Sequence, residues 1–507
     1  MFAKVKSQSI TGLKGFDVIV EADVSSGLPR FDLVGLPDAA VKESRERVRA
    51  SIKNCGLTFP ISRITVNIAP ADVKKEGAFY DLPILLSILK ASGQLRGSTD
   101  GCSFIGELSL DGEIRSANGV LPMILQAKDS GITSVFVPAD NAAEGAVVEG
   151  IDVIPAKNVL EILAHLSGEK PIEPVKKELD ESEIINDELD FCDVKGQHEA
   201  KRALEIAAAG GHNCLMIGTP GTGKSMLAKR IGSILPEMTF DEKIETTKIY
   251  SVAGELPPKA KLIARRPFRS PHHTISAQGL TGGGANPKPG EISLAHNGVL
   301  FMDEFPEFDR RAKESLRQPL EDGVVSITRA SGTVTYPSSI MVVAAMNPCP
   351  CGYMGHPTRQ CSCSEAAKKR YRDKTSGPLL DRIDIHIEVQ SIDYEQLSGK
   401  QKEESSAEIR KRVNRARAIQ TERFKGTGVT CNAKMTPRLT RKFCVLSPEA
   451  DALLKQSFDS LGLSPRAYDK ILRISRTIAD LEGCESIELS HVAEAIQYRS
   501  LDRKYWR

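Results

Sequence analysis

Short runs in which apolar and polar residues alternate predict β-strands in the first part of the chain. Phe16–Val24 alternates in this way, and Arg63–Ala69 and Ser134–Val137 are predicted as further strands, because one face of a half-buried strand is apolar. Leu82–Leu89 is apolar throughout and is predicted to be a buried helix. Strands and helices mixed in this order predict an α+β domain over residues 1–165.

The middle of the chain, residues 191–395, contains three largely apolar runs that are typical of buried strands. They are Cys214–Ile217, Gly298–Met302 and Ser339–Met346. A helix is predicted from Ser225 to Leu235, because the proline that follows cannot continue it. Buried strands separated by helical stretches predict an α/β core.

The remainder of the chain, residues 396–507, shows mainly helical spacing. Ser405–Phe424 is an amphipathic basic stretch, the Ser464–Pro465 pair resembles a helix start, and Leu489–Ile496 is a final helix. We therefore expect an all-α C-terminal domain. Residues 166–190 are rich in charge and contain two prolines, which predicts an exposed linker.

Composition narrows the possible classes of protein. The chain has 68 Lys and Arg against 66 Asp and Glu, so any nucleic-acid binding must come from local basic patches. Neither a signal segment nor an apolar run of membrane-spanning length is seen. The eleven cysteines are an odd number, and several lie in contexts typical of reduced thiols. These features predict a cytoplasmic protein without a membrane partner.

A glycine-rich stretch directly after Cys214–Ile217 fits the phosphate-binding pattern G-x-x-x-x-G-K-[ST]. Its residues are Gly218, Thr219, Pro220, Gly221, Thr222, Gly223, Lys224 and Ser225. Glycines let backbone N–H groups approach phosphate oxygens, the lysine can reach the β- and γ-phosphates, and the serine hydroxyl can ligate Mg²⁺. The alternative, a chance glycine-rich turn, is disfavoured by the strand before it and the helix after it. ATP and Mg²⁺ are therefore the predicted cofactors.

Two acids, Asp303 and Glu304, end the buried run that begins at Gly298. After a P-loop, such a pair is expected to supply an Mg²⁺ ligand from Asp303 and a carboxylate at Glu304 that polarises the attacking water. Surface acids at the end of an ordinary strand are the alternative. The distance of about eighty residues from the P-loop favours the catalytic interpretation.

Four of the eleven cysteines fall within fifteen residues, as two C-x-C pairs. They are Cys349, Cys351, Cys361 and Cys363. Four thiolates suit a tetrahedral Zn²⁺, although C-x₂-C is the commoner spacing. An iron–sulfur site is chemically possible, and unliganded thiols are the other alternative. A structural zinc is the favoured prediction.

Two insertions carry exposed basic residues. Arg265, Arg266 and Arg269 precede a glycine-rich stretch that begins at Gln278. A β-hairpin is predicted at 323–335, with Arg329 near its tip. Such a tip suits a nucleic-acid backbone, which binds Arg without base readout. For the arginine cluster, a solvated face or an inter-subunit contact is an equally weighted alternative. His272 and His273, which lie between these residues, are predicted to form loop hydrogen bonds rather than to bind metal.

The N-terminal segment resembles the proteolytic, S5-like domain of Lon-type proteases, on Gly106–Arg115 and Lys74–Gly77. The catalytic Ser and Lys positions of that domain fall on Phe79 and Leu121, which cannot act as nucleophile and base. An inactive scaffold is therefore expected. Lys75, within the matching segment, is predicted to be solvated surface charge.

Taken in order, the domains and the C-x-C pairs resemble the ComM/YifB family of Mg-chelatase-like AAA+ ATPases, whose core is a three-layer α/β P-loop fold. The resemblance implies roles for further residues. Val194 and Gln197 would contact adenine, and Asn347 would place the hydrolytic water. Arg382 would be an arginine finger for a neighbouring subunit, and Arg466 a lid arginine that reaches its own or an adjacent γ-phosphate. For Arg382, an internal ion pair with Asp381 or Asp384 is the alternative.

For the whole molecule, the resemblance implies a homo-oligomeric, hexameric ring that hydrolyses ATP to move single-stranded or branched DNA, as a branch-migration helicase in recombination and transformation. Two alternatives stand beside it. One is a chelatase-like motor that remodels a protein partner, and the other is a Lon-like protease-associated machine. The missing Ser and Lys at Phe79 and Leu121 disfavour the second.

Overall fold

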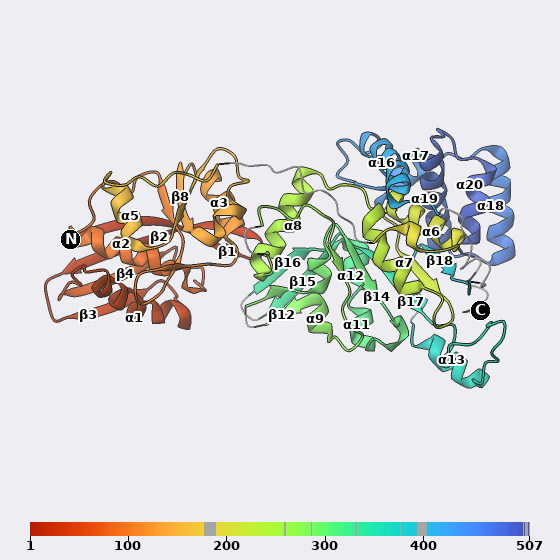
Figure 1. Cartoon of the computed structure of the whole chain (residues 1–507), viewed down its shortest axis with the longest axis horizontal. Helices are drawn as coiled ribbons and strands as arrows, with labels where there is room; N and C mark the ends of the chain where they lie inside the picture. The colour runs from red at the N-terminus through yellow and green to blue at the C-terminus, as the bar shows by residue number, and fades with distance from the viewer. Residues whose placement is uncertain are drawn as a thin grey trace. The chain divides into compact units, whose positions relative to one another are not determined.

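The computed structural model describes residues 1–176, 189–257, 260–284, 286–329, 332–375, 377–392, 403–499, 501 and 505. Their contacts divide the chain into two compact units (Figure 1). One comprises residues 1–183 and 243–264, and the other comprises residues 184–242 and 265–507. Much of the predicted linker, residues 177–188, lies outside the described residues.

The first unit is built on a seven-stranded mixed sheet with the strand order β3-β4-β2-β1-β5-β8-β9. Its strands are β1 (Phe2–Thr11), β2 (Lys14–Ser25), β3 (Arg30–Val34), β4 (Arg63–Ala69), β5 (Cys102–Phe104), β8 (Ser134–Pro138) and β9 (Asp152–Ala156). A separate short pair is formed by β6 (Glu107–Leu108) and β7 (Ile114–Arg115). β1, β2 and β4 pair antiparallel, and the other neighbours in the large sheet are parallel.

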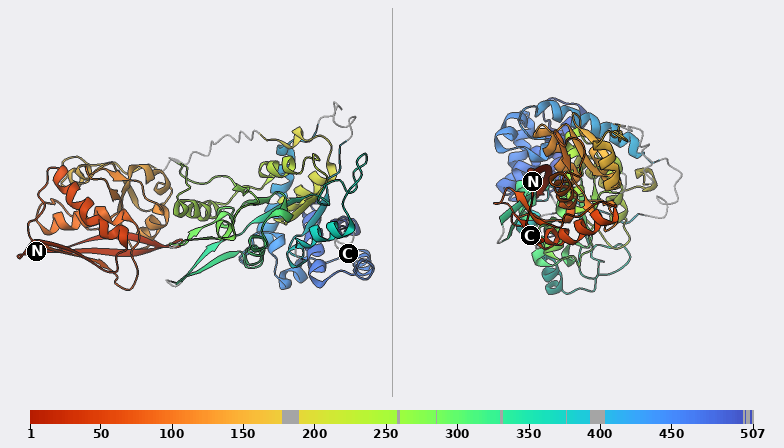
Figure 2. Two further views of the ribbon diagram at one scale, coloured as in Figure 1. Left: turned by 90° about the horizontal axis from the view of Figure 1, so that it is seen from below. Right: turned by 90° about the vertical axis from the view of Figure 1, so that its left-hand side faces the viewer.

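Helices cover one face of this sheet, as Figure 2 (left) shows for the first unit. They are α1 (Ala39–Asn54), α2 (Asp81–Ala91), α3 (Val120–Asp129), α4 (Ala142–Gly145) and α5 (Val159–Leu166). The alternation predicted for Phe16–Val24 is observed along β2, where Val18, Val20 and Ala22 are buried and Ile19 is exposed. The predicted α+β class of this domain is confirmed.

Residues 243–264 fall inside the range predicted for the ATPase core, yet they pack with the first unit. They include most of α8 (Phe240–Ala253). The Ser251 hydroxyl donates to the buried carboxylate of Glu144 at 2.6 Å, and the Ser251 carbonyl accepts the backbone N–H of Gly119 at 2.9 Å. These contacts join residues more than a hundred positions apart, so no local sequence pattern predicts them.

A five-stranded parallel sheet with the order β11-β14-β17-β10-β18 forms the centre of the second unit. Its strands are β11 (Phe268–Arg269), β14 (Val299–Met302), β17 (Met341–Met346), β10 (Cys214–Ile217) and β18 (Ile385–Glu388). The helices around it include α6 (His198–Gly210), α7 (Lys224–Arg230), α11 (Arg310–Glu314), α13 (Glu365–Asp373) and α14 (Gly377–Leu380). The three apolar runs are its three central strands, which confirms the predicted α/β core.

Two hairpins and three short helices are inserted in this core. The hairpins pair β12 (Gly282–Gly283) with β13 (Lys288–Pro289), and β15 (Val324–Arg329) with β16 (Gly332–Pro337). The short helices are α9 (Ala277–Thr281), α10 (Glu291–Leu294) and α12 (Arg317–Asp322). The second hairpin is the one predicted at 323–335, and residues 330–331 at its turn lie outside the described residues.

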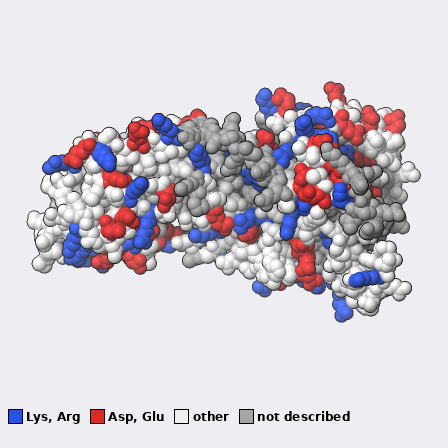
Figure 3. All heavy atoms as spheres, in the orientation of Figure 1, with Lys and Arg blue, Asp and Glu red and all other residues white. Residues whose placement is uncertain are grey.

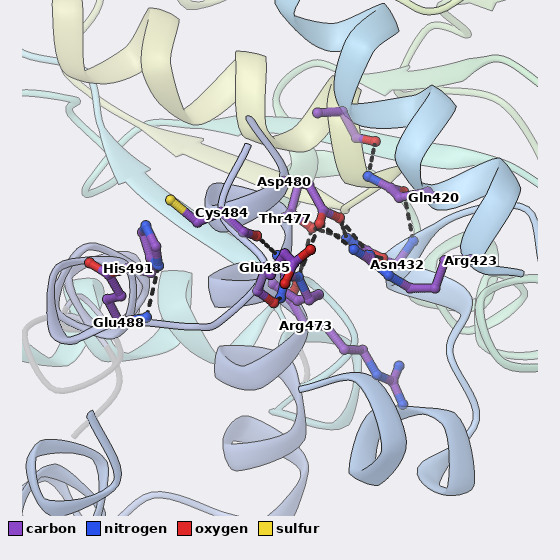
Figure 4. A network of polar contacts seen from close by, with 12 residues as sticks. Gln420, Arg423, Asn432, Arg473, Thr477, Asp480, Cys484, Glu485, Glu488 and His491 are labelled. Atoms are coloured by element: carbon purple, nitrogen blue, oxygen red, sulfur yellow. Dashed lines mark hydrogen bonds and ion pairs between the residues drawn. The ribbon is translucent and has the colours of Figure 1, made fainter. Parts of the chain in front are cut away.

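The C-terminal part is helical as predicted, and its described residues include α16 (Ser406–Arg423), α17 (Pro437–Phe443), α18 (Pro448–Leu461), α19 (Pro465–Glu482) and α20 (Leu489–Gln497). A buried polar network fixes α19 against α16 (Figure 4). The fully buried Asp480 carboxylate accepts two bonds from Arg423, at 2.7 and 2.5 Å, and further bonds from Asn432 at 2.8 Å and Arg476 at 3.0 Å. The network orients α19, which carries Arg466.

Neither a surface patch of one charge in the view of Figure 3 nor a membrane-spanning helix among the described residues stands out. Lys and Arg lie interspersed with Asp and Glu over the face drawn in Figure 3, in keeping with the nearly balanced composition. Among the described helices, not one combines the length and the apolar character that crossing a bilayer requires.

Candidate active site

The P-loop connects the carboxyl end of β10 to the first residue of α7, Lys224. Gly221 and Gly223 adopt φ values of 83° and 87°, a left-handed conformation that favours glycine. At Gly218 a side chain is excluded by lack of space, because a Cβ atom there would lie 2.5 Å from the carbonyl oxygen of Val389. The loop therefore directs backbone N–H groups and a helix N-terminus toward one point, an arrangement that binds phosphate.

The ammonium group of Lys224 lies inside this loop. It donates to the carbonyls of Gly218 at 2.7 Å and Thr219 at 2.9 Å, and to Oδ1 of Asn347 at 3.3 Å. Burial lowers its pKa below the ordinary lysine value. Asn347 follows directly after β17, the strand that neighbours β10. The structure thus brings together the predicted lysine and the predicted water-placing asparagine.

Ser225, in the P-loop, and Asp303, after β14, are also in direct contact. The Ser225 hydroxyl donates to Oδ2 of Asp303 at 2.6 Å, because β14 ends one position before the aspartate. A hydroxyl and a carboxylate at this distance are the hard oxygen ligands that Mg²⁺ takes beside a triphosphate. The residues present therefore fit a Mg²⁺–nucleotide complex, with Ser225 and Asp303 as the two protein ligands.

Glu304 adopts an unusual backbone conformation for a non-glycine residue, with φ 51° and ψ 43°. Its side chain is 57% exposed, and Oε2 lies 3.2 Å from Nδ1 of His273. The His273 ring packs against the His272 ring at an interplanar angle of 34°, with ring centroids 4.1 Å apart, in the segment before α9. The sequence predicts a loop hydrogen bond for His273 but does not indicate Glu304 as its partner, because no periodicity links residues 273 and 304.

Of the two residues predicted to contact adenine, Gln197 bonds to the P-loop. The amide of Gln197 donates to the Thr222 carbonyl at 3.3 Å and to the Gln390 carbonyl at 2.7 Å. Val194 is buried, and its carbonyl accepts the ammonium of Lys201. The segment predicted to contact adenine is therefore tied to the phosphate-binding loop by the Gln197 side chain.

Arg382 lies at the opposite edge of the sheet. Its carbonyl accepts the side chain of Asn213 at 3.2 Å, and Asn213 precedes the amino end of β10, whereas the P-loop follows its carboxyl end. At about 3.3 Å per residue, the five steps from 213 to 218 span about 16 Å. The length of β10 therefore lies between the Arg382 backbone and the phosphate-binding loop of its own chain.

Arg466 lies near Arg382, although 84 residues separate them in sequence. One carboxylate contacts both: Glu321 forms an ion pair with Nη2 of Arg382 and lies 3.8 Å from Nη2 of Arg466. All three line a cavity of about 680 Å³. Asp384, one of the two alternative partners of Arg382, instead pairs with Lys470 at 2.9 Å. Burial opposes ionisation of Asp384, but Lys470 and His212 hold its pKa well below the usual range.

The four clustered cysteines converge on one point. Sγ of Cys349, Sγ of Cys351 and Sγ of Cys361 are 3.5–3.6 Å apart, and Cys363 lies within 4.8 Å of each. In a regular tetrahedron with Zn–S bonds of about 2.3 Å, the sulfurs are about 3.8 Å apart. The donors and their spacing therefore fit a tetrahedral thiolate site.

This cysteine loop also touches the nucleotide site. A Cβ atom at Gly352 would lie 2.6 Å from Cγ of Pro220 in the P-loop, so the turn that carries Cys349 and Cys351 packs against the phosphate-binding loop. All eleven cysteines of the chain have free thiols.

A second group with possible metal donors, Glu482, Cys484 and His491, does not fit a metal. Nδ1 of His491 accepts the backbone N–H of Glu488 at 2.9 Å, so the proton resides on Nε2, which lies 3.0 Å from Glu482. Neither ring nitrogen then has a free lone pair for a cation.

The predicted DNA-contacting arginines separate into two groups. Arg266 donates to the Pro236 and Asn297 carbonyls and pairs with Glu242 at 2.8 Å, and Arg269 binds Glu291 with two bonds of 2.6 and 2.7 Å. Both serve packing between segments of the second unit. Arg265 is exposed.

Arg329 is exposed near the tip of the β15–β16 hairpin. Its Nε lies 3.4 Å from the Gly284 carbonyl, and Nη2 lies against Gly283. The hydroxyl of Tyr336, on β16, donates to the Pro287 carbonyl at 2.6 Å. The two predicted insertions therefore contact one another, and the glycine-rich stretch supports the arginine.

The Lon-like positions carry no hydrolytic pair. Phe79 and Leu121 are both buried in the apolar core of the first unit. The prediction that Lys75 is solvated is wrong: the side chain is fully buried, and its ammonium donates to the Val73 carbonyl at 2.7 Å. Burial lowers its pKa. The stretch around it folds back onto Leu36 and Asp38 through backbone hydrogen bonds, which covers the lysine.

A parallel sheet with a P-loop after β10, two acids after β14 and a polar sensor after β17 defines a AAA+ ATPase core. Residues 190–397 match the family described as magnesium chelatase, subunit ChlI, and residues 20–141 and 403–499 match the descriptions of subunit ChlI of Mg-chelatase and of its C-terminal part. The chain belongs to the ComM/YifB family of Mg-chelatase-like AAA+ ATPases.

Relatives that match nearly the full length of the chain support this family assignment. The chain is 43% identical to competence protein ComM of Haemophilus influenzae over 99% of this chain and 98% of that protein. It is 41% identical to YifB of Salmonella typhimurium, over 99% and 97% of the two chains. Lon protease of Mycolicibacterium smegmatis is 28% identical over 169 residues, which are 31% of this chain and 21% of that protein.

Proposed function

We propose that this chain is a ring-forming ATPase that couples ATP hydrolysis to the remodelling of branched or single-stranded DNA. One observation carries the DNA part: an ATPase core of the ComM type presents an exposed arginine, Arg329, on a hairpin supported by the glycine-rich stretch. A guanidinium in this position suits a phosphate backbone and demands no particular base sequence. A branch-migration activity in recombination and transformation fits the competence protein that it resembles.

The chemistry follows from the site. Lys224 and the backbone of the P-loop bind the triphosphate, and Ser225 and Asp303 hold the Mg²⁺, which neutralises phosphate charge when it is bound. Glu304 orients and polarises the attacking water, and Asn347 fixes its position through the same network as Lys224. These roles are electrostatic positioning, the main form of catalysis in phosphoryl transfer.

The site is completed by a neighbour. Arg382 and Arg466 lie together at the amino edge of the sheet, remote from the P-loop of their own chain. A head-to-tail interface would place this edge of one copy against the nucleotide of the next, and repetition of such an interface closes a ring. We assign both arginines to the γ-phosphate of the adjacent subunit and propose a hexamer.

We further propose that the four cysteines hold a structural Zn²⁺. Their Sγ separations are close to those of a tetrahedral site, and a backbone N–H donated by Tyr353 lowers the pKa of Cys351 to about 6. None of the eleven cysteines forms a disulfide, which suits the reducing cytoplasm, where we place the protein.

The test is ATP turnover by the purified chain with and without single-stranded and forked DNA, at low and at physiological salt. We expect stimulation by DNA that Arg329→Ala removes, with Arg438→Ala as the matched control at an exposed basic position outside the two insertions. No stimulation and no DNA binding at low salt would contradict the DNA function. In that case the chelatase-like alternative, a motor acting on a protein partner, would take its place, supported by the family match over residues 190–397.

A further inference from the structure

Glu321 lies at the contact between two arginines that the sequence could not connect with it. It is on α12, one residue before the end of the helix. Its carboxylate is bound by Nη2 of Arg382, which precedes β18, and lies 3.8 Å from Nη2 of Arg466, in the first turn of α19. The carboxylate is half exposed, at 47%, so an external group can reach it.

The Glu321 carboxylate occupies the position that a phosphate group would take on the two arginines. A planar guanidinium binds carboxylate and phosphate oxygens with the same geometry. If Arg382 and Arg466 act on the γ-phosphate of an adjacent copy, they must exchange Glu321 for phosphate oxygens. In the chain described here, the Arg382 guanidinium also donates to the Pro378 carbonyl at 2.5 Å, which holds it in place during the exchange.

Glu321 also lies next to the DNA-contacting hairpin in the chain. Asp322 ends α12, Gly323 takes a left-handed conformation with φ 67°, and β15 then begins. The side chain of Gln318, on the same helix, accepts the backbone N–H of Ser326 in β15 at 3.4 Å. A shift of α12 therefore moves the base of the hairpin that carries Arg329.

We propose that Glu321 is a positioning residue that holds Arg382 and Arg466 together until the triphosphate of a neighbouring copy displaces it. The displacement frees α12 and links the nucleotide state of one subunit to the DNA-contacting hairpin of the next. The proposal rests on the shared site proposed above, and it assigns to Glu321 a role that neither nucleotide binding nor water activation requires.

The test measures assembly in a background that binds ATP without hydrolysing it, Glu304→Gln. Glu321→Gln removes the competing charge at nearly constant shape, and Asp322→Asn is the matched control, since Asp322 has no described ion pair with either arginine. Mass photometry with ATP gives the protein concentration at half assembly. We expect Glu321→Gln to lower it by about two- to fivefold, the size expected for one partly exposed ion pair, and Asp322→Asn to leave it unchanged.

An unchanged or higher concentration at half assembly in Glu321→Gln, or an equal fall in Asp322→Asn, would overturn the role of Glu321 while the shared site stands. A Glu304→Gln chain that stays monomeric at every concentration with ATP would refute the shared site itself. In the hydrolysing chain, Glu321→Gln should reduce the ratio of ATPase rates with and without forked DNA. A ratio equal to that of the unaltered chain would remove the link to the hairpin.

Discussion

At the scale of single residues, the contact between His273 and Glu304 bears on the carboxylate that we propose activates water. The imidazole holds Oε2 at 3.2 Å from the side of the inserted segment, and Glu304 itself lies in a left-handed conformation. That segment continues through α9 to Gly283 and Gly284, which contact Arg329. A carboxylate held by the insertion is less free to activate water.

We therefore expect His273→Ala to raise the ATPase rate without DNA by about two- to fivefold, in line with the loss of one partly exposed polar pair. Steady-state phosphate release measures this rate. His165→Ala is the control, because His165 lies on α5 of the first unit, where its ring accepts the backbone N–H of Ile172. A rate that falls in His273→Ala, or that rises equally in both variants, would contradict the restraint.

Residues inside contiguous motifs could be predicted from the sequence, and residues defined by tertiary contacts could not. The P-loop glycines, Asp303 and Glu304 follow apolar strands directly, so their spacing indicates their chemistry. Glu321 and His273 acquire their partners only when distant segments fold together. The prediction for Lys75 is wrong for the same reason. A charged side chain is usually exposed, but here distant backbone segments cover the lysine.

At the scale of elements, the cysteine loop is both a candidate metal site and a support for the P-loop. Cys361→Ser should reduce bound zinc from about one equivalent per chain, the stoichiometry of a four-thiolate site, to none. It should also weaken ATP binding, because Gly352 packs on Pro220. Metal analysis of the purified protein and nucleotide titration measure the two effects.

Cys484→Ser is the control for the metal content, since Cys484 lies outside the four-thiolate cluster. Zinc absent from the unaltered chain, or fully retained after Cys361→Ser, would refute the metal site. Zinc lost with unchanged ATP affinity would leave the metal site but remove its connection to the P-loop.

The buried network of the lid makes a second prediction at this scale. Asp480→Ala leaves Arg423 and Arg476 without their buried carboxylate, and breaking a buried ion pair costs about 3–5 kcal/mol. Urea titrations followed by circular dichroism give the free energy of unfolding. Glu422→Ala, which removes an exposed pair with Lys425, should change it little, and equal effects of the two substitutions would contradict the network's role.

The sequence predicts the existence of elements with a strong apolar pattern, but it predicts their end points less accurately. The three apolar runs and the helix start at Pro465 are observed, because burial and capping are local signals. The predicted helix Ser225–Leu235 instead ends at Arg230 and continues as a 3₁₀ turn over Ile231–Ile234. The packing of residues 243–264 with the first unit depends on Glu144 and Gly119, far away in sequence.

For the whole molecule, the separation of the arginines from the P-loop is the central feature. β10 connects Asn213, which holds the Arg382 carbonyl, to the P-loop, so in the proposed ring one chain would contribute the two halves of the site to two different interfaces. A subunit on its own is then expected to bind ATP and to hydrolyse it poorly, because an arginine finger contributes about 10³–10⁵ to turnover.

Mixing two inactive variants tests this account most directly. Glu304→Gln loses the water-activating carboxylate, and Arg382→Ala loses the finger, but a mixed ring contains interfaces that join an intact P-loop side to an intact arginine. In an equal random mixture about one interface in four is of this kind, so we expect about a quarter of the ATPase rate of the unaltered chain. Arg382→Ala mixed with the double variant should stay inactive. If assemblies containing both single variants hydrolyse ATP no faster than either alone, the shared site is refuted.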